Sequence, residues 1–391
     1  MLNTPFSPWP SFTQEEADAV SRVVLSNKVN YWTGTECRSF ETEFAAWVGC
    51  DHAITLSNGT LALDVALKVL GVEEGDEVIT TPRTFIASAS SIVTAGATPV
   101  FADVCLNSQN ITSETIEAVL TPKTKAVVVV HLAGMPAEMD AIMALSEKHG
   151  FYVIEDCAQA HGAQYKGRSV GTIGHIGAWS FCQDKIMTTG GEGGMVTTND
   201  KALWASMWSY KDHGKSFDAI YNREHSPGFR WIHESFGTNW RMTEIQAVLG
   251  RIQIQRMAEW TKKRQANAAV IEAAMADLPI VRSVDIPEYI EHAEYKHYMF
   301  IRPENLKPSW TRDKIVDAIV ERGVPAYQGS CSEVYREKAF DGTSFRPEVP
   351  LKNAVELGET SLMFLVHPTL TQDEIDKTAE VLRAVLLEAQ A

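Results

Sequence analysis

Short apolar runs alternate with helix-like patterns over much of the first half of the chain. Residues 127–130 are four consecutive valines, which is typical of a strand buried on both faces. Over residues 60–70 and 137–149 the apolar positions recur every three or four residues, as on one face of a helix. We predict strands over residues 52–56, 77–80, 98–104, 125–132 and 150–155. This alternation indicates an α/β fold with a mostly parallel sheet and helices on both of its faces.

The pattern changes after about residue 250. A long helical stretch rich in Ala, Gln and Arg covers residues 251–275, and strand-like segments follow near residues 280–284 and 298–301. We therefore expect a large α/β domain over residues 1–250, which includes an N-terminal arm, and a smaller C-terminal α+β domain over residues 251–391.

Two segments mark possible starts of helices in the second half of the chain. Thr371 and Glu374 have the spacing of a capping box, which predicts a final amphipathic helix near the C-terminus. Residues 237–244 instead predict a polar loop that enters a helix near Met242. We expect no capping box there, because Arg241 would have to be its N-cap residue.

Composition and charge exclude several classes of protein. The chain has 391 residues, 45% of them hydrophobic, and its net charge of −15 disfavours binding to nucleic acid or to anionic lipid. Its six cysteines form no CxxC pair and its 11 histidines show no metal-ligand spacing, so we expect neither a metal site nor a disulfide framework. Residues 1–10 lack the pattern of a signal peptide, and no stretch approaches the roughly 18 apolar residues of a membrane span. We expect a cytoplasmic protein with reduced thiols and no membrane partner.

Two polar segments lie where a parallel sheet places ligands, beyond the carboxyl ends of its strands. Residues 57–60 follow a predicted strand and open a helix, so free backbone amides, Gly59 and the Thr60 hydroxyl can form a phosphate cradle. An ordinary N-cap turn explains this fragment equally well. Asp156 follows another apolar strand, and a carboxylate there can hold a heterocyclic nitrogen protonated. The alternative for Asp156 is a solvated turn residue.

Phe85 and Lys185 add a possible stacking surface and a possible nucleophile. Phe85 lies in a loop after a predicted strand and could stack on a flat cofactor, although a core aromatic is the commoner case. Lys185 lies just before the glycine-rich run of residues 188–194. Burial and nearby cations lower a lysine pKa, which prepares Schiff-base lysines, whereas the alternative is a solvated loop lysine. The run is no dinucleotide-binding loop, because the GxGxxG pattern breaks at Val196 and a strand-like segment follows the run instead of preceding it.

Taken in this order, a phosphate cradle, a stacking aromatic, a nitrogen-holding aspartate and a Schiff-base lysine resemble the fold-type I pyridoxal-phosphate enzymes. Among them, the chain resembles the DegT/DnrJ/EryC1/StrS sugar aminotransferases over most of its length. The resemblance is carried by residues 57–63 (SNGTLAL), 84–90 (TFIASAS), 99–104 (PVFADV), 155–181 (EDCAQAHGAQYKGRSVGTIGHIGAWSF), 190–200 (GGEGGMVTTND) and 239–247 (NWRMTEIQA). It implies a large domain with a mostly parallel seven-stranded sheet between helices, and a smaller α+β domain.

The resemblance also implies roles for individual residues. Lys185 would form the Schiff base with pyridoxal 5′-phosphate (PLP) and would then move a proton between the substrate carbon and the cofactor carbon. Asp156 would pair with the pyridine nitrogen, and Gln159 would contact the ring face and the phenolic oxygen. Phe85 would stack on the opposite face of the ring. The residues that would hold the phosphate are Gly59, Thr60 and Ser180.

The resemblance further implies the assembly and the type of reaction. The family's asparagine at the position of Asn239 reaches the phosphate from the neighbouring subunit, which implies a homodimer with shared active sites. Some members are dehydratases with histidine at the position of Lys185, so the lysine favours transamination. The implied amino donor is glutamate. The implied acceptor is a keto or aldehyde sugar, for which the predicted contacts are Trp32, Arg241 and Tyr327.

The identity of the acceptor sugar depends on one departure from the family pattern. Many members that act on nucleotide-linked keto sugars have a histidine-bearing segment where this chain has residues 324–335. The altered segment resembles the branch that aminates 8-oxo-Kdo to 8-amino-3,8-dideoxy-octulosonate for lipopolysaccharide, and this is our first prediction. The alternative is a nucleotide-linked 4-keto-6-deoxyhexose. A non-catalytic regulator on the same fold is disfavoured by Lys185, by Asp156 and by the absence of a basic patch.

Overall fold

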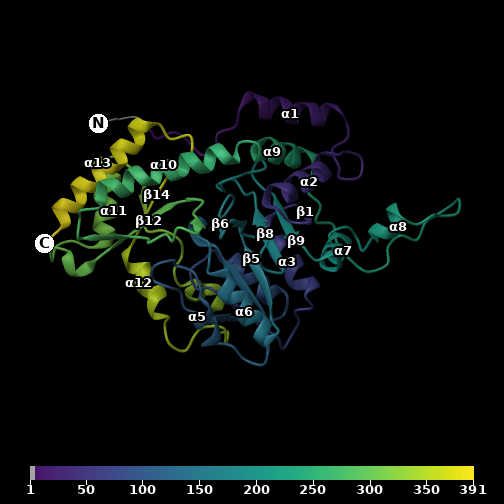
Figure 1. Ribbon diagram of the computed structural model, residues 1–391, viewed down its shortest axis with the longest axis horizontal. Coiled ribbons are helices and arrows are strands. Elements are labelled where there is room, and N and C mark those ends of the chain that lie inside the picture. The colour runs from purple at the N-terminus through teal and green to yellow at the C-terminus, as the bar shows by residue number, and fades with distance from the viewer. Residues whose placement is uncertain (1–4) are drawn as a thin grey trace.

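A computed structural model describes residues 5–391 of the chain (Figure 1). They form a large α/β domain and a smaller C-terminal domain, and the long helix α10 (Met257–Met275) runs from one to the other. Residues 1–4, the start of the segment that we expect not to be a signal peptide, lie outside the described residues. No helix within residues 5–391 is long and apolar enough to cross a membrane.

The central sheet of the large domain has seven strands. These are His52–Leu56 (β1), Glu77–Thr80 (β2), Thr98–Phe101 (β3), Thr124–Val130 (β4), Tyr152–Asp156 (β5), Ile176–Ser180 (β8) and Gly194–Thr198 (β9). Their order is β1-β9-β8-β5-β4-β2-β3. Strand β9 is antiparallel to both of its neighbours and the other pairings are parallel, so the predicted mostly parallel sheet is confirmed.

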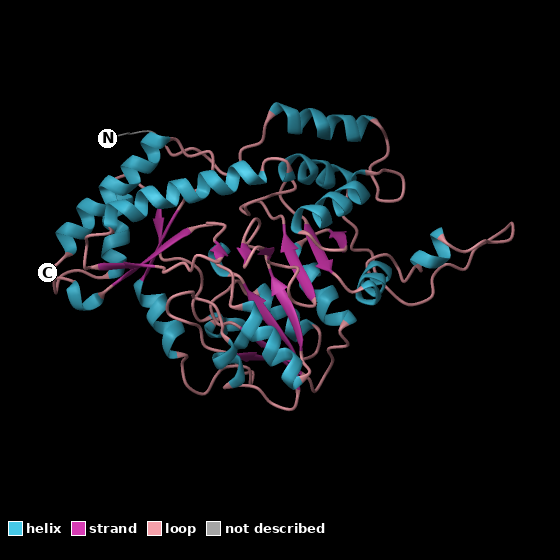
Figure 2. Cartoon of the chain, viewed as in Figure 1, coloured by secondary structure: helices cyan, strands magenta, loops and turns pink. Residues whose placement is uncertain are grey.

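Strand β4 shows why its sequence is a continuous apolar run. Val127 and Val129 belong to the core on one face of the sheet, whereas Ala126 and Val128 belong to the core on the other face. Successive side chains of a strand point to opposite faces, so a strand covered on both sides needs apolar residues at every position. Helices cover both faces of the sheet (Figure 2), and this explains why β4 has four consecutive valines.

The helices of the large domain precede α10 along the chain, and several of them pack against this sheet. They are Gln14–Leu25 (α1), Glu36–Val48 (α2), Gly59–Val69 (α3), Ala87–Thr94 (α4), Ser113–Glu117 (α5), Met139–His149 (α6), Lys201–Tyr210 (α7), Phe217–Tyr221 (α8) and Glu244–Ile254 (α9). Strand β3 ends at Phe101, three residues before the predicted end. The chain turns there because the carboxylate of Asp103 accepts hydrogen bonds from the backbone N–H groups of Asn353 and Ala354 in the C-terminal half.

The predicted single helix over residues 251–275 is wrong, because the structure has two helices there. Helix α9 ends at Ile254 and helix α10 begins at Met257, and between them Arg256 forms ion pairs with Glu15 and Glu16 of α1. The expected absence of a capping box before α9 is also wrong. Thr243 is the N-cap residue and Gln246 completes the box, a role that glutamine fills as well as glutamate.

The small domain is built on an antiparallel sheet in the order β10-β12-β14-β13. Its strands are Val281–Ser283 (β10), His297–Ile301 (β12), Ala326–Tyr327 (β13) and Ser361–Phe364 (β14). Its other helices are Arg312–Glu321 (α11), Lys352–Thr360 (α12) and Gln372–Ala389 (α13). The capping box of Thr371 and Glu374 at the start of α13 is confirmed. The domain boundary at residue 250 stays a prediction.

Strand pairing and the N-terminal arm are among the connections that hold the small domain against the large one. A three-stranded sheet pairs Ile290–Glu291 (β11) with Gln164–Tyr165 (β6), which in turn pairs with Arg168–Ser169 (β7). The N-terminal arm also crosses to the small domain, where the Ser7 hydroxyl donates a hydrogen bond of 2.9 Å to the carboxylate of Glu374. These connections place the segment between β11 and β12 beside the carboxyl edge of the central sheet.

Candidate active site

One cavity of about 630 Å³ lies at the carboxyl ends of β1, β5 and β8. Parallel strands end at the same edge of a sheet, so residues far apart in the sequence meet there. The structure brings seven of the predicted site residues to its wall: Gly59, Thr60, Phe85, Asp156, Gln159, Ser180 and Lys185.

The predicted phosphate cradle is the start of helix α3. Asn58 is its N-cap residue, and the side-chain oxygen accepts the N–H of Leu61 at 3.0 Å. The first backbone N–H groups of a helix have no partner within the helix and point toward an anion. A Cβ atom at Gly59 would lie 2.5 Å from the Cβ of Ser180, so only glycine lets α3 approach β8 this closely. The cradle fits a phosphate group.

Asp156 is a buried carboxylate with neutral partners only. It accepts hydrogen bonds from the Ser88 hydroxyl at 2.8 Å and from the Ala158 N–H at 3.1 Å. Burial raises the pKa of Asp156, while the hydrogen bonds from Ser88 and Ala158 and the charge of Lys185 lower it. No cation within the described residues forms an ion pair with Asp156. Such a carboxylate fits the protonated ring nitrogen that PLP offers.

Lys185 has contacts with the N-terminal arm and with its neighbour Asp184, which is itself bound by Tyr295. Its carbonyl accepts a hydrogen bond of 2.8 Å from the indole N–H of Trp9, in the N-terminal arm. Its Nζ is 3.5 Å from the carboxylate of Asp184, which accepts a 2.5 Å hydrogen bond from the Tyr295 hydroxyl. Sequence reasoning missed Trp9 and Tyr295, because such long-range packing leaves no local pattern. It also missed Asp184, although this residue directly precedes Lys185.

Gln159 and Phe85 face the cavity with an amide group and a ring for which the described residues provide no hydrogen-bond acceptor or ring partner. The side-chain oxygen of Gln159 accepts the N–H of Ala133 at 2.8 Å, which leaves the amide hydrogens for a ligand. The ring of Phe85 is 68% exposed at the cavity mouth, as a residue that stacks on a ligand would be. Ser88 was missed. Its position four residues after Thr84 was a usable signal. In the structure the two hydroxyl oxygens lie 2.9 Å apart.

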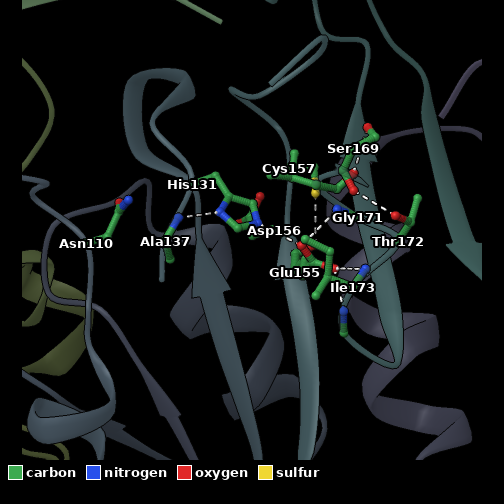
Figure 3. Close-up of polar contacts among 12 residues, drawn as sticks. Asn110, His131, Ala137, Glu155, Asp156, Cys157, Ser169, Gly171, Thr172 and Ile173 are labelled. Carbon is green, nitrogen blue, oxygen red and sulfur yellow. Dashed lines mark hydrogen bonds and ion pairs between the residues drawn. The ribbon is translucent and has the colours of Figure 1, made fainter. Parts of the chain in front are cut away.

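A buried network lies directly behind Asp156 (Figure 3). The backbone N–H of His131 donates to the carbonyl of Asp156, and its Nε2 donates to Glu155 at 2.9 Å. The N–H of Ala137 donates to its Nδ1, so the proton is on Nε2. Ligand atoms of His131, Glu155 and Cys157 lie within 4.8 Å of one another, but the protein's own hydrogen bonds use them. Glu155 also accepts backbone hydrogen bonds from Gly171, Ile173 and Gly174. The network holds the end of β5.

Three other predicted residues gather elsewhere, around Asp212. The indole N–H of Trp32 donates to one carboxylate oxygen at 2.7 Å, and Arg241 and Lys215 contact the other at 2.5 and 3.0 Å. Asn239 forms a backbone bridge with Asp212. None of these residues lines the Lys185 cavity within its own chain. Their predicted roles stay predictions, and the role of Asn239 requires a second subunit.

A second cavity, of about 310 Å³, adjoins the first on the side of the small domain. Gly329, Ser330 and Cys331, from the segment that departs from the family pattern, line it. Tyr327 lies in the same segment but lines neither cavity, and its side chain is 44% exposed. The segment therefore shapes the second cavity through residues other than the predicted one.

The fold and the residues of the first cavity define a PLP-dependent enzyme of fold type I. The sequence profile of the DegT/DnrJ/EryC1/StrS aminotransferase family matches residues 10–383, so the chain belongs to that family. This confirms the predicted class, a PLP-dependent sugar aminotransferase.

Known proteins similar to this chain cover nearly all of it. The X-ray structure of an aminotransferase from Psychrobacter cryohalolentis is 64% identical, with a TM-score of 0.97, and the match covers 98% of this chain and 100% of that one. GDP-perosamine synthase of Caulobacter vibrioides is 35% identical over 352 residues, 89% of each chain. The UDP-N-acetyl-3-dehydro-alpha-D-glucosamine 3-aminotransferase of Acidithiobacillus ferrooxidans is 34% identical over 362 residues, 93% of this chain and 92% of the relative.

Proposed function

We propose that the protein transfers an amino group from glutamate to a keto or aldehyde sugar, with PLP bound in the Lys185 cavity. The observation that carries this proposal is the meeting of a lysine amine, a buried unpaired carboxylate and an anion cradle in one cavity. Asp156 would hold the ring nitrogen of PLP. The residues that would hold its phosphate are Gly59, Thr60 and Ser180.

The residues around Lys185 have different roles in amino transfer. PLP, when bound, supplies an electrophilic carbon and a ring that accepts electrons. The amine of Lys185 would take a proton from the substrate carbon as a base and would then deliver a proton to the cofactor carbon as an acid. Asp184 and Tyr295 position that amine, since they form a hydrogen-bonded pair beside it. Asp156 would keep the proton on the ring nitrogen, because no cation within residues 5–391 forms an ion pair with its buried carboxylate.

The direct test of amino donation is optical. The PLP-loaded protein has a visible absorption band, and glutamate should remove it as the amino group passes to the cofactor. A stable band in the presence of excess glutamate would contradict the proposal, and other amino acids would then be tried in the same assay as donors.

We also propose that the enzyme is a homodimer with shared active sites. The segment after α8 extends away from the body of the molecule (Figure 1). It carries Phe229, Trp231 and Phe236, which are 76%, 83% and 100% exposed. Large aromatic side chains gathered in this way favour a protein partner, and a second copy of the chain is the partner that the role of Asn239 requires. A cytoplasmic location stays a prediction.

Two acceptor sugars remain, each supported by a different observation. GDP-perosamine synthase and the UDP-linked 3-aminotransferase have nucleotide-linked sugars in their names, which supports a nucleotide-linked keto sugar for this enzyme. The altered segment of residues 324–335 supports 8-oxo-Kdo instead, since part of it lines the second cavity. We place the nucleotide-linked sugar first, because the similarity to those relatives extends over most of the chain.

The acceptor is decided by comparing two substrates. Enzyme loaded with pyridoxamine phosphate should show a higher kcat/KM for a nucleotide-linked 4-keto-6-deoxyhexose than for 8-oxo-Kdo. A clear preference for 8-oxo-Kdo would instead support amination of 8-oxo-Kdo for lipopolysaccharide as the function.

A further inference from the structure

The second cavity carries a positive charge that has no ion-pair partner among the described residues. Lys296 lies in its wall, just before β12, with Nζ 5.0 Å from the centroid of the Tyr295 ring. No carboxylate within residues 5–391 forms an ion pair with Lys296. In contrast, the fully buried Lys211 meets Glu41 at 3.1 Å. Lys296 is therefore available to a ligand.

The surroundings of Lys296 favour the binding of an anion. Burial and the cations Arg264 and Lys185, opposed by Asp184, together lower the pKa of Lys296 to about 8. Arg264 is itself buried, and its Nε and Nη2 find no hydrogen-bond partner within the described residues. Arg264 lines neither cavity, so its charge acts from behind the wall. Lys296 is the cation that an incoming anion would meet, and in a poorly solvated region their interaction is stronger than at the surface.

Most of the other residues that line the second cavity are neutral, and hydrogen bonds join two of them. The Tyr298 hydroxyl accepts the N–H of Ser330 at 2.9 Å and lies 3.1 Å from the Ser330 hydroxyl. Gly329 has a φ of +98°, and a Cβ there would lie 2.5 Å from the Tyr298 ring, so glycine allows this close approach. Asp184 and Glu337 also line the cavity but both are exposed, so solvent screens their charges.

We infer that Lys296 binds the side-chain carboxylate of the amino donor and so sets a preference for glutamate, an inference that rests on the proposed function. The walls of the two cavities share Thr84, Phe85, Gln159, Asp184 and Lys185. A donor whose amino group reaches the first cavity can thus extend its side chain into the second. Glutamate carries its second carboxylate on a short methylene chain, which suits this arrangement. The ammonium and the carboxylate then form a charge-assisted hydrogen bond.

The test compares two donors that differ only in the charge at the end of the side chain. L-glutamate and L-glutamine are each mixed with the PLP-loaded full-length enzyme, without sugar, and the loss of the visible band gives the rate constant. We expect Lys296→Met to lower the second-order rate constant for glutamate at least about tenfold, and that for glutamine less than about threefold. Lys296→Arg keeps the charge and should retain most of the glutamate rate. Lys166→Met, in an exposed ion pair with Asp140, is the matched control.

Binding provides a second readout that does not depend on turnover. Calorimetry with glutarate, which has two carboxylates and no amino group, should give a Kd about tenfold higher for Lys296→Met than for the wild type. Butyrate, with one carboxylate, should bind both proteins equally.

Several results would overturn the inference. They are an equal loss for both donors, no loss for either, and a loss confined to the later step with the sugar. A wild-type enzyme that does not react with glutamate would overturn the proposed function itself. A wild type that reacts, together with a Lys296→Met variant that reacts as fast, would overturn only the role of Lys296.

Discussion

Two buried aspartates of the large domain have opposite surroundings. Asp212 is paired with Arg241 and Lys215 and accepts a third hydrogen bond from Trp32, so the chain neutralises its charge. Within the part of the chain that the structure describes, the Asp156 carboxylate has only a hydroxyl and an amide as partners, and burial raises its pKa. An unpaired buried charge costs stability, so it persists where a ligand supplies the missing partner. The comparison separates a ligand site from a structural cluster of the same residue types.

Replacing Lys185, in the same cavity as Asp156, should have the largest effect on amino transfer. Lys185→Ala removes both the Schiff-base amine and the proton carrier, so amino transfer should fall below detection while PLP still binds non-covalently. The rate of glutamate-dependent loss of the visible band is the measurement, and Lys166→Met is again the control. Measurable turnover by Lys185→Ala would mean that another amine does the chemistry.

Asp156→Asn should come next, with a loss of roughly 100-fold in the rate of the glutamate half-reaction. The amide keeps the shape of the side chain but does not hold the ring nitrogen protonated. Bound PLP, measured after gel filtration, should remain close to the wild-type amount. If Asp156→Asn reacted with glutamate at nearly the wild-type rate, Asp156 would not be the partner of that nitrogen.

The two aspartates should also differ in their effect on stability. In the PLP-free protein, Asp212→Ala should lower the free energy of unfolding by about 3 kcal/mol, because Arg241 and Lys215 lose their counter-charge in a poorly solvated place. Asp156→Asn removes a buried charge with no cation and should leave the PLP-free protein as stable as the wild type or more so. Urea unfolding at pH 7 measures both variants. A greater loss for Asp156→Asn than for Asp212→Ala would reverse the comparison.

The smallest expected effect concerns the subunit that completes the site. Asn239→Ala should weaken PLP retention, and mixing it with inactive Lys185→Ala chains should recover part of the activity. A hybrid dimer would contain one site with both substitutions and one intact site, since each site takes the lysine from one subunit and Asn239 from the other. Activity after verified subunit exchange is the measurement, and its failure to recover would count against shared sites.

The sequence predicts those parts of the site that lie at the ends of strands. The apolar strands are recognisable from local pattern, and the polar residue that follows each one is then placed at a common edge of the sheet. Gly59 and Asp156 were found in this way, and both line the Lys185 cavity.

The sequence does not predict the residues that tertiary packing brings in. Trp9 reaches Lys185 from the N-terminal arm. Tyr295 and Lys296 line the second cavity with Lys185, because β11 pairs with a strand of the large domain. The break between α9 and α10 was missed for a related reason, since the helical pattern continues through Arg256 while its ion pairs to α1 mark the break.

Reduction of the PLP-loaded enzyme with borohydride, followed by peptide mapping, tests the central assignment most directly. The cavities beside the cofactor cradle present two lysines, Lys185 and Lys296, and reduction fixes the cofactor to the one that forms the Schiff base. The account predicts a single pyridoxyl adduct on the peptide that contains Lys185. An adduct on Lys296, or on any lysine other than Lys185, would contradict it.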